Sequence, residues 1–145
     1  MSVLIEHVQA SSVLNGDDES YGSHNMLDSN PDTCWNSEGL PEHTLRFFLS
    51  CPTRVASLEL TFQAGFVGRN MRVGSETGGE GAINGSTTEA KADELACFEP
   101  EETNEPQLFR LPTALVDATV ICVNFCGSTD FYGRIVIYSA KLFSL

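Results

Sequence analysis

Alternation of apolar and polar residues is the feature that most restricts what this chain can fold into. In residues 54–62, Leu58, Leu60 and Phe62 fall on one face of an extended segment, and Glu59 and Thr61 fall on the other. A period of two places alternate side chains on opposite faces of a strand, whereas a helix needs a period of about 3.6 residues. The segment is therefore predicted to be a strand with one buried face.

The same signal recurs along most of the chain. Alternation predicts strands at 45–49 and 118–125, and shorter apolar segments predict strands at 3–8, 70–73 and 107–111. Residues 135–143 are apolar at nearly every position, which predicts a central strand covered on both faces. Because Gly, Pro and Asn separate these segments and helical periodicity is almost absent, we expect an all-β antiparallel sandwich or barrel. The length of 145 residues fits a single domain spanning 1–145.

Acidic residues are concentrated in one glycine-rich stretch, at about residues 75–106. Within it nine carboxylates stand against one lysine, which accounts for −8 of the chain's net charge of −12. We interpret residues 78–85 as a flexible loop, and Ser86 with Glu89 as the capping box of a short helix that runs through Leu95. The stretch is either a solvated insertion between strands, which is the usual fate of charge runs, or a surface for a basic partner.

Charge and motifs exclude several classes of function. With 20 Asp and Glu residues against 8 Lys and Arg residues, we expect no binding of nucleic acid or of an anionic membrane through bulk electrostatics. No window reaches the ~18 apolar residues of a membrane span. The glycine run at 79–85 lacks the spacing of a nucleotide-binding loop, and none of the three histidines, His7, His24 and His43, has the context of a catalytic base. We therefore expect a protein that is not an enzyme.

The cysteines and the first residues bear on the compartment. The five cysteines are odd in number and widely scattered, unlike a disulfide framework: Cys34, Cys51, Cys97, Cys122 and Cys126. On an extended strand Cys122 and Cys126 would lie roughly 13 Å apart, too far to share a zinc ion or a disulfide. Residues 1–7 carry no secretory signal. We expect a protein of the nucleus, the cytoplasm or both, and not a secreted one.

The run from Asn25 to Ser37 gathers Asn, Asp and Thr oxygens beside the only tryptophan, Trp35. Its pattern Asp-x-Asn-Pro-x-Thr-x-Trp resembles the early loop of discoidin-like, or galactose-binding-domain-like, β-sandwiches. A closer resemblance, to the small nuclear-receptor-associated repressor family, runs from about Ser11 to Leu142. It rests on Ser11–Asn15, Asp32–Ser37, Gln63–Phe66 and Thr129–Tyr138. The resemblance implies a jelly-roll β-sandwich and a protein partner, described for that family as a testicular orphan nuclear receptor.

The wider resemblance also implies a calcium site in the early loop as one of two interpretations. By motif position, Asp28 would supply a carboxylate and Thr33 a hydroxyl and a carbonyl, with main-chain oxygens from Asn25 and Asn30. Ser139 stands near the place where the superfamily often has a Glu, which lowers the charge available to Ca²⁺. The favoured alternative is a turn in which Asp28 accepts backbone N–H bonds, so we expect no required cofactor.

A first group of candidate partner-binding residues lies in a Gly-flanked turn. Phe66 and Arg69 are placed there, and an aromatic residue beside an Arg on a loop is a common anchor in protein recognition. The resemblance implies that loops at one end of the sandwich carry the ligand site, although a packed loop is the alternative. Trp35 could in principle stack on a ligand, but we expect it in the core with its indole N–H satisfied.

A second group of candidate partner-binding residues follows the last alternating segment. It consists of Phe131, Tyr132 and Arg134, next to Asp130. We expect Arg134 to pair with Asp130 and pin the hairpin, with ligand contact as the alternative role.

These observations favour a non-enzymatic, intracellular protein-interaction module that resembles a nuclear-receptor-associated transcriptional repressor. Its partner would be a nuclear receptor or a subunit of another complex. The alternatives are a carbohydrate-binding module, a calcium-binding module and a subunit of an intraflagellar-transport-type complex. Sugar binding is less favoured, because a sugar site requires an exposed aromatic platform with convergent Arg, Asn and His side chains, and because such modules are usually secreted or fused to hydrolases, which we do not expect of this chain.

Overall fold

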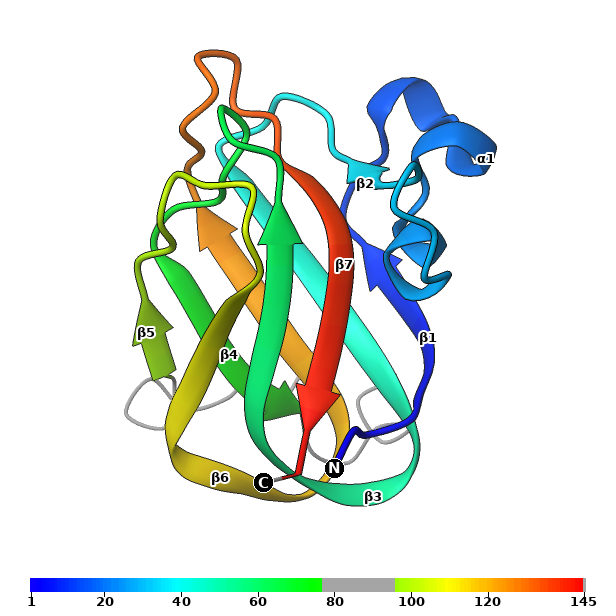
Figure 1. Ribbon diagram of the computed structural model, residues 1–145, viewed down its shortest axis with the longest axis vertical. Helices are drawn as coiled ribbons and strands as arrows, with labels where there is room; N and C mark the ends of the chain where they lie inside the picture. The colour runs from blue at the N-terminus through cyan, green and yellow to red at the C-terminus, as the bar shows by residue number, and fades with distance from the viewer. Residues whose placement is uncertain (77–95, 145) are drawn as a thin grey trace.

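The computed structural model describes residues 1–76 and 96–144. These residues form a two-layered antiparallel β-sandwich, drawn in Figure 1 with both termini at the lower end, which confirms the all-β antiparallel prediction. The strands are β1 (Ile5–Ala10), β2 (Trp35–Asn36), β3 (Glu42–Phe62), β4 (Met71–Glu76), β5 (Ala96–Phe98), β6 (Gln107–Cys126) and β7 (Val136–Phe143). Between β1 and β2 lie two 3-10 helices, η1 (Leu14–Gly16) and η2 (Ser23–Leu27), and the short helix α1 (Asp18–Tyr21).

Two long bent strands, β3 and β6, connect the layers. The segments predicted as separate strands at 45–49 and 54–62 are the two halves of β3, and those at 107–111 and 118–125 are the two halves of β6. The pairing of β3 with β6 shifts register between Phe48 and Ser57. Because both strands bend at the same level, their paired ribbon passes from one layer to the other.

The bends divide the strands between a back and a front layer in Figure 1. The back layer holds β1, the first half of β3, the second half of β6, β4 and β5. The front layer holds β2, β7, the second half of β3 and the first half of β6. Glu42 pairs with Cys126 and Leu60 pairs with Gln107, so both ends of β3 and of β6 lie at the end of the sandwich opposite the termini. That end collects the loops between strands.

The core fills the space between the layers with the residues that alternation predicts to be buried. Leu58, Leu60 and Phe62 are fully buried, and burying a side chain of this size stabilises a fold by about 1.5–3 kcal/mol. Trp35 is also fully buried, and its indole N–H donates to the carbonyl oxygen of Ser12 over 2.9 Å. The placement of Trp35 in the core is confirmed.

Strand β7 differs from its prediction. Its inner-face residues Ile137, Ala140 and Leu142 are buried, as expected, but Lys141 on the other face is exposed. The prediction of a central strand covered on both faces is therefore wrong at Lys141, whereas Tyr138, Ser139 and Phe143 are half-buried. Two consecutive residues, Val136 and Ile137, are buried at the start of the strand, where they pair with β2. The apolar run therefore indicates two covered faces only for this part of β7.

The two ends of the acidic stretch at 75–106 belong to the sheet. Glu76 ends β4, and residues 96–98 form β5, which pairs with residues 71–73 of β4. The predicted flexible loop at 78–85 and the predicted helix at 86–95 lie outside the described residues.

None of the helices in residues 1–76 and 96–144 is long and apolar enough to cross a membrane. All five cysteines are free thiols, and Cys122 and Cys126 both lie on β6.

Candidate functional site

Four loops meet at the end of the sandwich opposite the termini (Figure 1). They are residues 37–41, 63–70, 99–106 and 127–135. The predicted partner-binding residues lie on two of them, 63–70 and 127–135. We call the face formed at this end by Leu40, Phe66, Phe131, Tyr132 and Arg134 the apical surface.

Hydrogen bonds join loops 63–70 and 127–135 into one unit. The N–H of Val67 donates to Thr129 Oγ1 over 3.0 Å, and the N–H of Thr129 donates to the carbonyl of Val67 over 2.9 Å. The N–H of Arg69 donates to the carbonyl of Gly127 over 3.0 Å. These bonds link segments far apart in the sequence, so the loops present their side chains from a fixed backbone.

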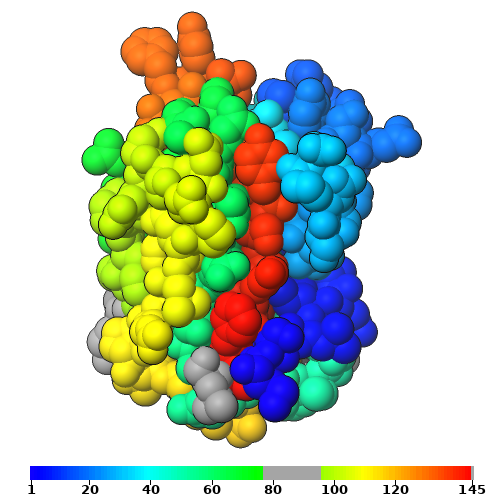
Figure 2. Space-filling view, in the orientation of Figure 1, coloured from blue at the N-terminus to red at the C-terminus, as the bar shows by residue number. Residues whose placement is uncertain are grey.

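The apical surface carries the most exposed aromatic side chains of the described residues. Phe131 is 92% exposed and Tyr132 is 69% exposed, and their rings pack edge to face with centroids 5.2 Å apart. The guanidinium of Arg134 lies 5.6 Å from the centre of the Tyr132 ring and 5.3 Å from that of Phe66. The structure therefore brings together four of the five predicted residues, and their segment, orange in Figure 2, protrudes from the molecule.

Asp130 holds Arg134 in this position. Its Oδ2 accepts both Nε–H and the backbone N–H of Arg134, each over 3.0 Å. Burial alone would raise the pKa of Asp130, but the bonds from Arg134 bring it below its ordinary value. The hydroxyl of Ser128 closes the loop by donating to the carbonyl of Arg134 over 2.6 Å. The predicted structural pairing of Arg134 with Asp130 is confirmed.

Loop 37–41 packs against loop 127–135, which carries Phe131 and Tyr132. Buried His43, at the start of β3, donates Nε2–H to the carbonyl of Gly133 over 2.7 Å. Gly133 has a φ of 85° and lies against the backbone of Leu40, and a methyl group at Gly39 would overlap the carbonyl oxygen of Tyr132. These close approaches bring exposed Leu40 into the apical surface. Sequence reasoning missed Leu40, because a single apolar residue between polar ones carries no periodic signal.

Arg69 lies at the same end but pairs with the acidic loop. Its Nε is 3.6 Å from Oε2 of Glu99, and both side chains are more than half exposed. The carboxylate of Glu102 accepts the N–H of Gly65. Loop 99–106 thus packs against loop 63–70 and brings its carboxylates beside the apical surface.

The early loop has the geometry of a self-bonded turn. Asp28 Oδ2 accepts the hydroxyl of Thr33 over 2.6 Å and Oδ1 accepts the N–H of Asn30 over 2.9 Å, and these bonds lower the pKa of Asp28. Buried Asn25 donates its amide to two main-chain carbonyls. Ca²⁺ takes about six to eight oxygen ligands, whereas both oxygens of the Asp28 carboxylate are engaged with donors of the loop itself. In residues 1–76 and 96–144, no three His, Cys, Asp or Glu side chains are grouped to hold a metal. The hydrogen bonds of Asp28 are those that the turn interpretation expects, and the calcium site stays a prediction.

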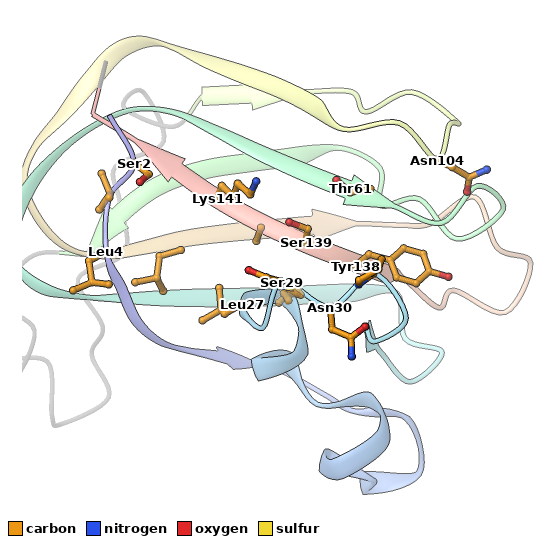
Figure 3. Close-up of a pocket in the computed structure, with 15 residues that line it drawn as sticks. Ser2, Leu4, Leu27, Ser29, Asn30, Thr61, Asn104, Tyr138, Ser139 and Lys141 are labelled. Carbon is orange, nitrogen blue, oxygen red and sulfur yellow. The ribbon is translucent and has the colours of Figure 1, made fainter.

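A groove of about 860 Å³ runs along the outer face of β7 beside the early loop (Figure 3). Tyr138 is its aromatic member, and the hydroxyl of Tyr138 donates to Gln63 Oε1 over 2.8 Å. The polar side chains in the lining include Ser29, Asn30, Thr61, Asn104, Ser139 and Lys141. Asn30 is the one predicted site residue among them, and the hydroxyl, amide and ammonium groups can all donate hydrogen bonds to a polar ligand.

A half-buried ion pair joins β3 to β4 on the back layer. Nε and Nη2 of Arg46 donate to the two carboxylate oxygens of Glu76 over 2.9 and 2.5 Å, and the thiol of Cys122 donates to Glu76 over 2.8 Å. Burial and the neighbouring carboxylate raise the pKa of Cys122 to about 12. Burial alone would raise the pKa of Glu76, yet the bonds from Arg46 and Cys122 lower it. One carboxylate of the acidic stretch therefore has a structural role.

The chain is similar to curated proteins named nuclear receptor 2C2-associated protein. The human protein is 33% identical over 134 residues, which cover 92% of this chain and 88% of the relative. The Danio rerio protein is 33% identical over 92% of this chain and 87% of the relative, and the Xenopus tropicalis protein is 34% identical over 94% and 90%. No protein-family model matches the chain.

Solved structures identify the fold. An F5/8 type C domain from Bacteroides fragilis superposes with a TM-score of 0.72 at 20% identity, covering 93% of this chain and 88% of that domain. A family 32 carbohydrate-binding module from C. perfringens, solved in complex with galactose, superposes with a TM-score of 0.70 at 18% identity, covering 98% of each chain. These neighbours confirm the discoidin-like, galactose-binding-domain-like jelly roll that the sequence resemblance implies.

Proposed function

The chain belongs to the family of nuclear receptor 2C2-associated proteins, and we propose that it is a non-enzymatic protein-interaction module that associates with a nuclear receptor through its apical surface. The name of the relatives supports the choice of partner, since the similarity covers about nine-tenths of this chain and of theirs. Association with such a receptor places the protein in the nucleus for at least part of its life. The exposed Phe131 and Tyr132 are the single observation that carries the proposal.

The physical properties of the apical surface suit protein recognition. Binding energy at protein interfaces is concentrated in a few aromatic and Arg side chains, and here two aromatic rings and Arg134 are in mutual contact. The Asp130 bonds fix the side chain of Arg134, and the loop bonds fix the backbone that carries the rings, which reduces the entropy lost on association. Exposed apolar side chains gathered on one surface in this way are typical of interaction sites.

The test is calorimetry of the purified chain with purified human nuclear receptor 2C2, the receptor after which the human relative is named. We expect the intact chain to bind and the double variant Phe131→Ala/Tyr132→Ala to bind at least about 30-fold more weakly, as for a pair of interface anchors. The matched control is Leu4→Ala/Val116→Ala, which removes two apolar side chains that are 73% and 69% exposed away from the loop end.

Two results would contradict the proposal. One is that the intact chain gives no saturable heat with the receptor. The other is that the apical and control double variants bind with equal affinity, since the contact would then lie elsewhere on the molecule.

Carbohydrate binding is the second candidate function. The fold neighbour bound to galactose and the groove along β7, with its hydroxyl and amide lining, favour it. Titration of the chain with galactose separates the two candidates. We expect no saturable heat at millimolar sugar, and a saturable signal removed by Ser139→Val/Thr61→Val would support the sugar site instead.

A further inference from the structure

The loop end combines an apolar centre with an excess of negative charge. The four loops carry six carboxylates and two guanidinium groups. Both guanidiniums are already paired with carboxylates, Arg134 with Asp130 and Arg69 with Glu99. The other carboxylates of the loops are those of Glu38, Glu101, Glu102 and Glu105, so the described loop end presents net negative charge around the apical surface.

The apical surface is convex at its centre. Phe131, 92% exposed, and Tyr132 stand out from the loop, and the segment that carries them projects beyond the body of the molecule in Figure 2. Small-molecule sites are concave and surround most of the ligand, which a projecting pair of rings cannot do. Apolar groups of this shape lose contact with water by entering a cavity on another molecule.

We propose that Phe131 and Tyr132 insert into an apolar pocket of a protein partner whose rim carries Lys and Arg side chains. This inference rests on the proposed function and adds the chemistry of the partner's binding surface. The rings provide the buried anchor, and the loop carboxylates select a rim of opposite charge and speed the encounter. Arg134, neutralised by Asp130 and stacked between rings, extends the anchor without repelling that rim.

The same charges disfavour the other surfaces that take up exposed aromatic residues. An anionic membrane attracts segments rich in Lys and Arg, and nucleic acid requires cations opposite its phosphates. Neither unpaired cation nor net positive charge is found on the described loops. A basic-rimmed protein pocket is the surface that satisfies both the rings and the carboxylates.

Glu101 and Glu105 allow the charge to be changed without disturbing the loops. Both are exposed, and neither side chain makes a hydrogen bond or ion pair with another described residue; their backbone N–H groups hold the loop instead. The double variant Glu101→Gln/Glu105→Gln therefore removes charge alone. Its matched control is Glu6→Gln/Asp117→Asn, which removes the same charge from exposed positions on β1 and at the bend of β6, away from the loop end.

The experiment measures the affinity of the intact chain and both charge variants for purified human nuclear receptor 2C2 at about 50 mM and about 500 mM salt, since salt screens exposed charges. We expect the intact chain to bind on the order of tenfold more weakly at high salt. Glu101→Gln/Glu105→Gln should weaken binding several-fold at low salt and reduce the salt dependence, whereas Glu6→Gln/Asp117→Asn should match the intact chain.

The outcomes separate this inference from the function on which it rests. Receptor binding that needs Phe131 but is unchanged, or strengthened, by Glu101→Gln/Glu105→Gln overturns the basic rim and leaves the proposed function standing. Absence of receptor binding by the intact chain overturns both. Binding of the intact chain to phosphatidylcholine vesicles with about 30% phosphatidylserine, lost in Phe131→Ala, would identify a membrane as the occupant and also overturn the inference.

Discussion

Replacing Arg46 by Met should destabilise the protein by leaving the carboxylate of Glu76 without its counter-ion. The side chain of Glu76 is 9% exposed, and Arg46 provides two of its three hydrogen bonds. Removing one partner of a fully buried ion pair costs about 3–5 kcal/mol. Arg46 itself is 34% exposed, so water can enter part of the vacated space, and we expect a loss of about 2–3 kcal/mol in the free energy of unfolding. For a domain of this size that corresponds to a fall of roughly 6–12 °C in Tm.

The pH dependence of this loss follows from the direction of the Glu76 shift. In the intact chain the pKa of Glu76 is lowered, so its ion pair contributes stability above the unfolded-state pKa, and this contribution disappears as the pH falls through the lower folded-state value. In Arg46→Met burial dominates and raises the pKa of Glu76, so the carboxyl takes up a proton at higher pH and the cost of burying it shrinks. The difference between the two proteins should therefore be largest near neutral pH and smaller in acid.

The assay is urea unfolding at pH 7 and at pH 4.5, with Lys141→Met as the control for loss of one cation. Lys141 is exposed and forms no ion pair with a described residue, so its replacement should change stability by less than about 0.5 kcal/mol. A loss below about 0.5 kcal/mol for Arg46→Met, or an equal loss at both pH values, would refute the buried ion pair.

Three further predictions concern the loop end and the early loop. Burial lowers the pKa of His43, so below pH 6.5 the unfolded chain gains a proton that the folded chain does not, and the free energy of unfolding should decrease as the pH falls. In thermal unfolding, the Tm of His43→Gln should decrease less over the same pH range, and an equal decrease would contradict this. Gly39→Ala should force the Tyr132 carbonyl to move, which should weaken receptor binding about tenfold and cost about 1–3 kcal/mol of stability. Unchanged affinity of the folded variant would show that the loop position is irrelevant. Because the Asp28 carboxylate accepts hydrogen bonds from Thr33 and Asn30, millimolar calcium should not raise the Tm of chelator-stripped protein. A rise in Tm that Asp28→Asn abolishes would establish the metal site instead.

The parts of the fold that follow from local periodicity could be predicted from the sequence. Alternation identified the buried face at Leu58, Leu60 and Phe62, and the lone Trp35 beside a polar loop was correctly placed in the core. The continuity of β3 and β6 could not be predicted, since Pro52 and Pro112 resemble turn residues but lie within the bends of strands that continue. Strand β5, three residues long, is too short to carry a periodic signal.

The site was predictable only where its contacts are local. Asp130 and Arg134 are four residues apart, so their pairing could be inferred from the sequence. Leu40 lies at the apical surface because its backbone packs against Gly133, and Glu76, at the start of the acidic stretch, forms an ion pair with Arg46 on another strand. Both contacts depend on which strands lie side by side and in what register, and neither is encoded in any short segment.

The central claim, that the apical surface is where a partner binds, is tested most directly by photo-crosslinking in cells. A photoreactive benzoylphenylalanine replaces Phe131 in one variant and Val116 in another. Val116 is also exposed, but it lies at the bend of β6, at the end of the sandwich opposite the apical surface. The account predicts that light produces a covalent adduct with the nuclear receptor from position 131 and none from position 116. An adduct from position 116 with none from 131, or equal adducts from both, would contradict it.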